Sequence, residues 1–343
     1  MPAASTITVF FATNSNPIGD PPTDFGPLLG PIDGTAIRFG TAEINEKTLK
    51  LVRLDVAPEK LVLDGPADRR LVFGSRQVFD DLKAKMIAHA RDTLIFVHGF
   101  GYSFTEALER AAEFKKFLAL QMNIFVFTWP SDGKQTPVTA YPKDRADVEK
   151  SGDAMARAIE IAARYLQEIA AVDRCEQRLH LLSHSMGNYA LRYGVQGLCR
   201  RYKTALPRLF DKVVLAAADE DADTFDFDAK MRPLPQLAQQ VLVYHTPRDR
   251  ALIISDLTKG NPDRLGAGGP ENTRVINDKI SVVDVSEALS GDDDFTNHQY
   301  FRVNTRVRAD LRQVFGDIVP FQVKGRLYMP DAKRYRLKKA MPT

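Results

Sequence analysis

One serine in this chain stands in a context that would make it a nucleophile. The segment Arg178-Leu-His-Leu-Leu-Ser183-His-Ser185-Met-Gly187-Asn188 runs from apolar residues to a serine with very small residues at minus two and plus two. This pattern is typical of a nucleophile elbow, a sharp strand-to-helix turn that exposes a serine. The flanking residues must be small because strand and helix nearly touch there. The pattern predicts Ser185 as the nucleophile, with Ser183 where glycine is more usual.

The surrounding residues favour an elbow over the simpler interpretation, an ordinary strand end followed by a turn. Residues 178–182 are predicted to form a short buried strand. The segment 188–200 is predicted to be a helix, because its apolar residues recur at helical spacing. Ser185 is therefore expected at a strand-to-helix junction.

A serine hydroxyl needs a neighbouring base, normally histidine, which a carboxylate in turn orients. On a nucleophile elbow of this kind the chain order is serine, acid, histidine. Of the six histidines only His245 and His298 follow Ser185. His245 directly follows a predicted strand, in the loop where the acid is expected. His298 lies beyond the last predicted strand and is the predicted base, the alternative being a surface-loop histidine.

The acid is predicted to be Asp249, which follows the predicted strand 241–244. Its rivals are Asp219, Asp221 and Asp223, one strand earlier, which are otherwise interpreted as a solvated loop or a helix cap.

The tetrahedral intermediate of acyl transfer requires fixed N–H donors. The backbone N–H groups of Met186, next to the nucleophile, and of Phe100 are predicted to form this oxyanion hole. Gly99 would let the backbone approach the substrate. His98 and His184 are expected to be structural hydrogen-bonding residues.

The elements that must position these residues alternate along the chain. Residues 1–90 are expected to supply antiparallel edge strands (7–12, 37–44 and 49–56) and a helix at 80–91 that lead into the core. From Thr93 onwards apolar strands (94–97, 123–128, 178–182, 212–217, 241–244 and 281–285) alternate with helices (from a capping box at Ser103, and at 144–171, 188–200 and 236–240). The prediction is an α/β protein with a mostly parallel central sheet flanked by helices on both faces. Its expected segments are 1–90, a catalytic core at 91–305 and a C-terminal basic extension at 306–343.

Bulk composition narrows the class of function. The 343 residues carry 47 Lys and Arg against 44 Asp and Glu, a net charge of +3, which argues against a nucleic-acid surface. The basic stretch Lys324–Lys339 is expected to be a solvated tail. Neither a secretion signal nor a membrane-spanning run is visible, and two cysteines without metal-ligand spacing suit a reducing compartment. A cytoplasmic protein without metal or cofactor is expected, and its oligomeric state is left open.

Several ordered motifs resemble a family of bacterial α/β-hydrolases of unknown function, over about residues 5–305. The resemblance rests on an opening strand with Phe10-Phe-Ala-Thr-Asn14, on His98-Gly-Phe100, on Ser103-Phe-Thr-Glu-Ala-Leu-Glu-Arg-Ala-Ala112, on Thr128-Trp-Pro-Ser131, on His184-Ser-Met-Gly-Asn188 and on Asp249-Arg-Ala-Leu252. It implies the α/β-hydrolase fold and the positions of the triad, and it implies no substrate. The loop 260–272 and the tail after about Val307 have no counterpart and would form a lid or pocket mouth, or cover the sheet.

The expected function is hydrolysis of a small-molecule carboxylic ester by Ser185, Asp249 and His298. Trp129, Phe100, Tyr102 and Tyr141 are candidates to line an acyl pocket, unless they only pack loops. Amide or thioester hydrolysis would use the same residues. A catalytically silent hydrolase that acts as a binding module is the alternative from another class. A dinucleotide binder is disfavoured because no G-x-G-x-x-G fingerprint is present.

Overall fold

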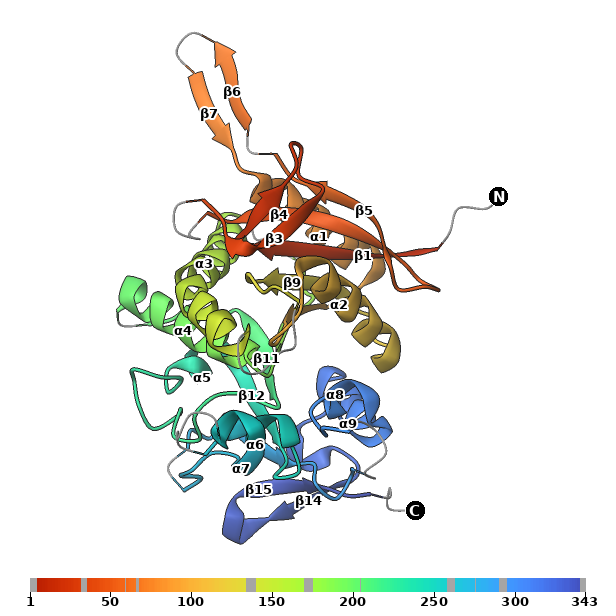
Figure 1. Cartoon of the computed structure of the whole chain (residues 1–343), viewed down its shortest axis with the longest axis vertical. Helices are drawn as coiled ribbons and strands as arrows, with labels where there is room; N and C mark the ends of the chain where they lie inside the picture. The colour runs from red at the N-terminus through yellow and green to blue at the C-terminus, as the bar shows by residue number, and fades with distance from the viewer. Residues whose placement is uncertain are drawn as a thin grey trace.

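A computed structural model of the chain describes residues 5–31, 36–58, 60–65, 68–133, 140–169, 175–203, 205–257, 263–274, 276–289 and 295–339. Its centre is an eleven-stranded sheet with the order β14-β15-β13-β12-β11-β10-β8-β9-β1-β4-β5 (Figure 1). These strands are β1 (Thr6–Thr13), β4 (Arg38–Asn45), β5 (Leu51–Val56), β8 (Thr93–Val97), β9 (Asn123–Thr128), β10 (Leu179–His184), β11 (Phe210–Ala216), β12 (Ala238–His245), β13 (Ile280–Asp284), β14 (Arg326–Met329) and β15 (Arg334–Leu337). The hairpins β2 (Ser15–Ile18)–β3 (Asp24–Leu29) and β6 (Lys60–Gly65)–β7 (Asp68–Val72) stand outside it.

The middle of the sheet is parallel and both of its ends are antiparallel. Each pairing from β1 through β9, β8, β10, β11, β12 and β13 to β15 is parallel, whereas β4, β5 and β14 run antiparallel to their neighbours. The predicted α/β class, with a mostly parallel sheet and N-terminal antiparallel edge strands, is confirmed. Carboxyl ends of neighbouring parallel strands share one edge, so the loops after β8, β10, β12 and β13 meet there.

Helices cover both faces of the sheet. They are α1 (Gly74–His89), α2 (Phe104–Leu118), α3 (Ala140–Glu168), α4 (Gly187–Tyr202), α5 (Leu234–Leu237), α6 (Arg250–Leu257), α7 (Leu265–Gly268), α8 (Tyr300–Val303) and α9 (Thr305–Phe315). Two short 3-10 helices follow, at Pro320–Gln322 and Pro330–Ala332.

Each face has its own apolar core because residues alternate across a strand. On β8, Leu94 and Phe96 belong to the core that contains α2 and α9 residues. Val97 belongs to the core that contains α1, α3 and α4 residues, and Ile95 packs against it. The buried strands thus fix the face on which each helix lies.

Two helices begin earlier than their predicted starts. Helix α1 begins at Gly74 rather than Asp80, and it buries Val78, Leu82 and Met86 at four-residue spacing. Helix α3 begins at Ala140 rather than Asp144, because Pro142 falls in its first turn, where the missing N–H costs no hydrogen bond. Residues 170 and 171, the predicted end of this helix, lie outside the described residues. The short helix expected at 236–240 is α5, Leu234–Leu237, after which β12 begins.

The expectation that Lys324–Lys339 is a solvated tail is wrong. The segment forms β14 and β15, and β15 extends the sheet by pairing with β13. Leu337 is buried in the core. The Arg326 guanidinium is buried with the Asp310 carboxylate of α9, 2.6 Å away, and also contacts the Tyr244 hydroxyl at 2.9 Å. The number of basic residues in this segment suggests a solvated tail. It does not predict the hairpin, because it gives no sign that Arg326 is buried and paired with Asp310.

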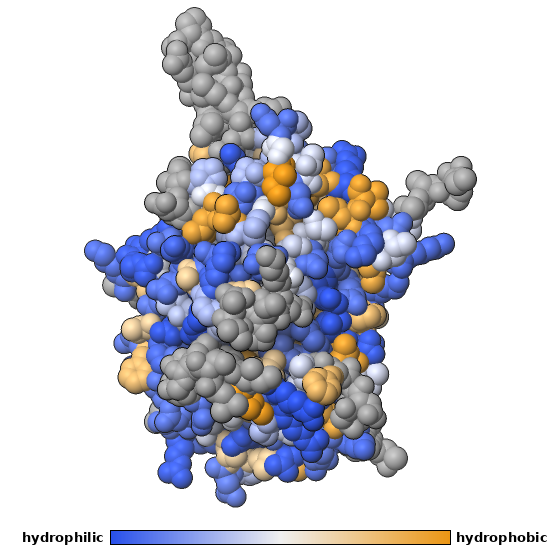
Figure 2. All heavy atoms as spheres, in the orientation of Figure 1, coloured by the Kyte–Doolittle hydropathy of each residue, from blue (hydrophilic) through white to orange (hydrophobic). Residues whose placement is uncertain are grey.

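The face shown in Figure 2 is mainly hydrophilic, with apolar side chains in small separate groups. Within the described ranges, no helix is long and apolar enough to cross a membrane.

Candidate active site

Ser185 sits at a strained turn between β10 and α4. Its backbone φ is +54°, in the left-handed region that a serine rarely adopts. Its carbonyl oxygen accepts hydrogen bonds from the N–H groups of Asn188 at 3.0 Å and Asp219 at 3.2 Å, and from the Asn188 side chain at 3.0 Å. These bonds hold the strained turn, as a nucleophile elbow requires.

The neighbouring glycines account for the tight approach of the backbone. A Cβ on Gly187 would lie 2.6 Å from the His98 carbonyl oxygen, closer than any side chain tolerates. A Cβ on Gly99 would lie 2.9 Å from the Cβ of Ser185. The loop after β8 therefore passes directly beside the serine. This places the backbone of Gly99 and Phe100 next to Ser185.

His298 and Asp249 contact each other, 49 residues apart in the chain. The Nδ1 of His298 lies 2.7 Å from the Asp249 carboxylate. Asp249 is buried, and burial raises its pKa against the opposing effect of His298. Its other oxygen accepts the Leu252 N–H at 3.1 Å. With Nδ1–H donated to Asp249, the Nε2 of a neutral His298 is left as the proton acceptor.

The two loops that carry this pair are bound to each other. The Arg250 N–H donates to the Thr296 carbonyl oxygen at 2.8 Å, and the Asn297 amide donates to the Arg248 carbonyl oxygen at 3.3 Å. Asn297 has a φ of +53°, a conformation that asparagine tolerates better than most residues. The histidine loop is thereby fixed on the acid loop.

The other sequence candidates have different partners. His245 is buried with Nδ1 on the Ala267 carbonyl oxygen at 3.1 Å. Asp219 contacts the Tyr141 hydroxyl and lies 3.4 Å from Arg264. Asp221 binds Arg264 and Lys230, and Asp223 binds Lys230. None of these contacts brings a rival acid or base to Asp249 or His298.

His98 supports the loop after β8 from within. Because the Trp129 N–H must donate to Nε2 at 3.2 Å, the ring proton is on Nδ1, which donates to the Gly99 carbonyl oxygen at 2.9 Å. Burial lowers the pKa of His98 to about 4, so the ring is neutral. Trp129 stacks on it, and Tyr102 meets it edge-on. Both aromatic residues are buried and pack this loop.

His184, inside the elbow, contacts the catalytic candidate. Its ring lies 4.7 Å from that of His298, and its Nε2 donates to the His298 carbonyl oxygen at 3.2 Å. Burial lowers its pKa well below the usual range. A neutral His184 therefore holds the loop that carries His298.

The beginning of α3 also contacts the loop that contains Phe100. The Tyr141 ring packs on that of Phe100 at 5.4 Å. The buried Asp144 carboxylate accepts the Gly101 N–H at 3.3 Å and the Ser131 hydroxyl at 2.5 Å. The sequence predicts Tyr141 as a site candidate but Asp144 only as the start of a helix. The signal for Asp144 is an acid within an apolar helical stripe.

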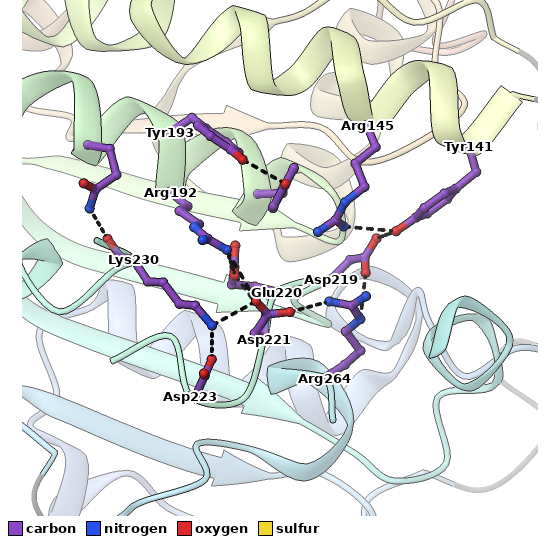
Figure 3. Close-up of polar contacts among 12 residues, drawn as sticks. Tyr141, Arg145, Arg192, Tyr193, Asp219, Glu220, Asp221, Asp223, Lys230 and Arg264 are labelled. Atoms are coloured by element: carbon purple, nitrogen blue, oxygen red, sulfur yellow. Dashed lines mark hydrogen bonds and ion pairs between the residues drawn. The ribbon is translucent and has the colours of Figure 1, made fainter. Parts of the chain in front are cut away.

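A set of charged side chains lies below α3 and α4, here called the Arg264 cluster. Figure 3 shows its members converging on the segment after β11. The fully buried Arg264 binds Asp221 at 2.8 Å, and Arg192 binds Glu220 at 2.9 Å. The cluster consists of Arg192, Asp219, Glu220, Asp221, Asp223, Lys230 and Arg264. Its acids, three of them interpreted above as a possible solvated loop, are ion-paired instead.

Comparison with known proteins identifies one family. A family model described as "Alpha/beta hydrolase of unknown function (DUF900)" matches residues 76–316. No curated protein matches the chain. Among solved structures the chain is similar to Pyrococcus horikoshii acylaminoacyl peptidase, with 12% identity over 83% of this chain and 48% of that one and a TM-score of 0.34. A likeness that weak carries no inference about activity. Within the described ranges, no group of three or more His, Cys, Asp and Glu residues is arranged to hold a metal ion.

Proposed function

Since the chain belongs to this family of α/β-hydrolases it is a hydrolase, and we propose that it hydrolyses carboxylic esters through Ser185, His298 and Asp249. The observation that carries the proposal is the coincidence of two features. Ser185 has the strained φ of an elbow, and the only histidine bound to Asp249 within the described residues is His298, at 2.7 Å.

The proposed reaction passes through an acyl-enzyme. His298 Nε2 takes the proton of the Ser185 hydroxyl as its oxygen attacks the ester carbonyl carbon. The N–H groups of Met186, at the start of α4, and of Phe100 bind the oxyanion. The protonated His298, stabilised by Asp249, then donates its proton to the departing alkoxide. Water repeats the sequence on the acyl group, which leaves as the carboxylic acid and restores Ser185.

Substitution of the nucleophile tests the proposal. Ser185→Ala should lower kcat for p-nitrophenyl acetate and butyrate by about four orders of magnitude or more, with an unchanged melting temperature. Parallel assays with a thioester and an anilide of the same acyl groups rank the alternative leaving groups. Wild-type protein that is folded but hydrolyses none of them contradicts the proposal and favours a binding module. Hydrolysis that persists in Ser185→Ala contradicts the assignment of the nucleophile.

A further inference from the structure

One arginine beside the candidate site is not used by the proposed reaction. Arg145 extends from α3 towards Asp219, next to Tyr141 (Figure 3). Its guanidinium lies 3.6 Å from the centre of the Tyr189 ring. Among the described residues it makes a single hydrogen bond, from Nη1 to the Tyr141 hydroxyl at 3.4 Å. An arginine has five N–H donors, so most of the Arg145 donors have no acceptor within the part of the chain that the structure describes.

The surroundings of Arg145 place it at the edge of the reacting centre. Tyr189 is in the first turn of α4, and its N–H donates to the Met186 carbonyl oxygen at 3.0 Å. Tyr141 packs on Phe100, the second oxyanion candidate. Asp219 donates its N–H to the Ser185 carbonyl oxygen. Each neighbour of Arg145 thus touches an element of the proposed site. Arg145 itself is half-buried and not enclosed.

Arg145 keeps its positive charge although the Asp219 carboxylate is nearby. Burial alone would lower the pKa of Arg145, but the Asp219 carboxylate raises it, so the side chain is cationic. Asp219 is almost fully buried and is shared with Arg264 and Tyr141. Burial also raises the pKa of Glu220 to about 7, so the Arg264 cluster loses part of its negative charge at neutral pH. The region therefore favours an anion.

From this geometry we infer that Arg145 is a specificity-determining residue that binds a carboxylate of the substrate beside the ester attacked by Ser185. A guanidinium held over an aromatic ring, as Arg145 is over Tyr189, can offer its N–H groups in a fork that matches a carboxylate. A carboxylate carries a single negative charge, which suits a site where Arg145 is beside an acid, Asp219. A phosphate carries more negative charge and would need more cations to balance it. The inference rests on the proposed function and adds the class of substrate, esters that carry a carboxylate.

Matched esters test it on the full-length protein, with acid release followed at constant pH. Monomethyl glutarate is compared with methyl 5-methylhexanoate, in which an isopropyl group replaces the carboxylate. A second pair, 4-carboxyphenyl acetate and 4-isopropylphenyl acetate, puts the charge on the leaving group. The wild type should prefer the anionic member of at least one pair. Arg145→Met should reduce that preference in kcat/KM by about 10- to 100-fold, the usual worth of a charged hydrogen bond. Arg145→Lys, which keeps the charge without the fork, should fall between.

Arg200→Met is the matched control, since Arg200 is an exposed arginine on the neighbouring helix α4 and binds Asp153. This substitution removes the same charge and should leave unchanged the ratio of kcat/KM between the anionic and the neutral ester. The inference is overturned if the wild type prefers neither anionic ester. It is also overturned if Arg145→Met lowers kcat/KM equally for the anionic and the neutral ester of the pair. If Ser185→Ala still hydrolyses the neutral esters, the proposed function is refuted instead. The two failures are therefore distinguishable.

Discussion

At the scale of single residues, the structure pairs one acid with one histidine. Sequence order alone left four acids and two histidines open. Asp249 contacts His298, whereas Asp219, Asp221 and Asp223 bind tyrosine or cationic groups. The sequence predicts candidates through chain order, but it does not predict which carboxylates have cationic partners, because Arg264 lies 43 residues beyond Asp221 in the chain.

Substitution of the acids tests this pairing. Asp249→Asn should lower kcat for p-nitrophenyl esters by about three to four orders of magnitude, since the amide no longer holds His298 in the required tautomer. Asp219→Asn should lower kcat less than about tenfold and mainly reduce the melting temperature, because its side chain binds Arg264 and Tyr141. Both variants are measured for kcat and for thermal unfolding. A severe loss of kcat in Asp219→Asn with an active Asp249→Asn would show that the acid is misassigned.

At the scale of elements, continuous apolar runs located the parallel strands well. Residues 94–97 and 123–128 fall within β8 and β9 as expected. The starts of helices were less predictable, because Gly74 and Pro142 are read as helix breakers, although each is tolerated in a first turn. The hairpin β14–β15 was missed because its stability depends on the buried contact between Arg326 and Asp310, from separate parts of the chain.

The segment after β11 makes stability depend on pH. Burial raises the pKa of Glu220 from 4.5 to about 7, so the folded chain holds a proton that the unfolded chain releases between these values. Its contribution to the free energy of unfolding is therefore present below about pH 4.5 and is lost as pH rises to 7, by about 3 kcal/mol. In Glu220→Gln this contribution should be absent.

Urea unfolding of wild type and Glu220→Gln at several pH values between 4.5 and 7.5 measures the difference. Glu220→Gln should gain stability relative to wild type as pH increases. Parallel pH dependences in the two proteins would mean that Glu220 is ionised in the folded state throughout, held by Arg192.

At the scale of the whole molecule, the fold brings loops that are far apart in sequence to one edge of the sheet. Parallel order puts the carboxyl ends of β8, β10 and β12 at the same edge of the sheet, where Gly99, Ser185 and Asp249 follow them. This convergence was predictable from alternating strands and helices. The contacts of Arg145 with Tyr141 and Tyr189 were not, since they depend on how α3 packs against α4 (Figure 3).

The most direct measurement is covalent labelling with a fluorophosphonate, which reacts with a serine only when it is activated. Wild type, Ser185→Ala and His298→Ala are compared at equal concentration after circular dichroism has established that each is folded. The modified peptide is identified by mass spectrometry. We predict rapid labelling at Ser185 in the wild type, no labelling in Ser185→Ala, and labelling slowed by at least about a thousandfold in His298→Ala. Folded wild-type protein that remains unlabelled, or that is labelled at another residue, would contradict Ser185 as the catalytic nucleophile.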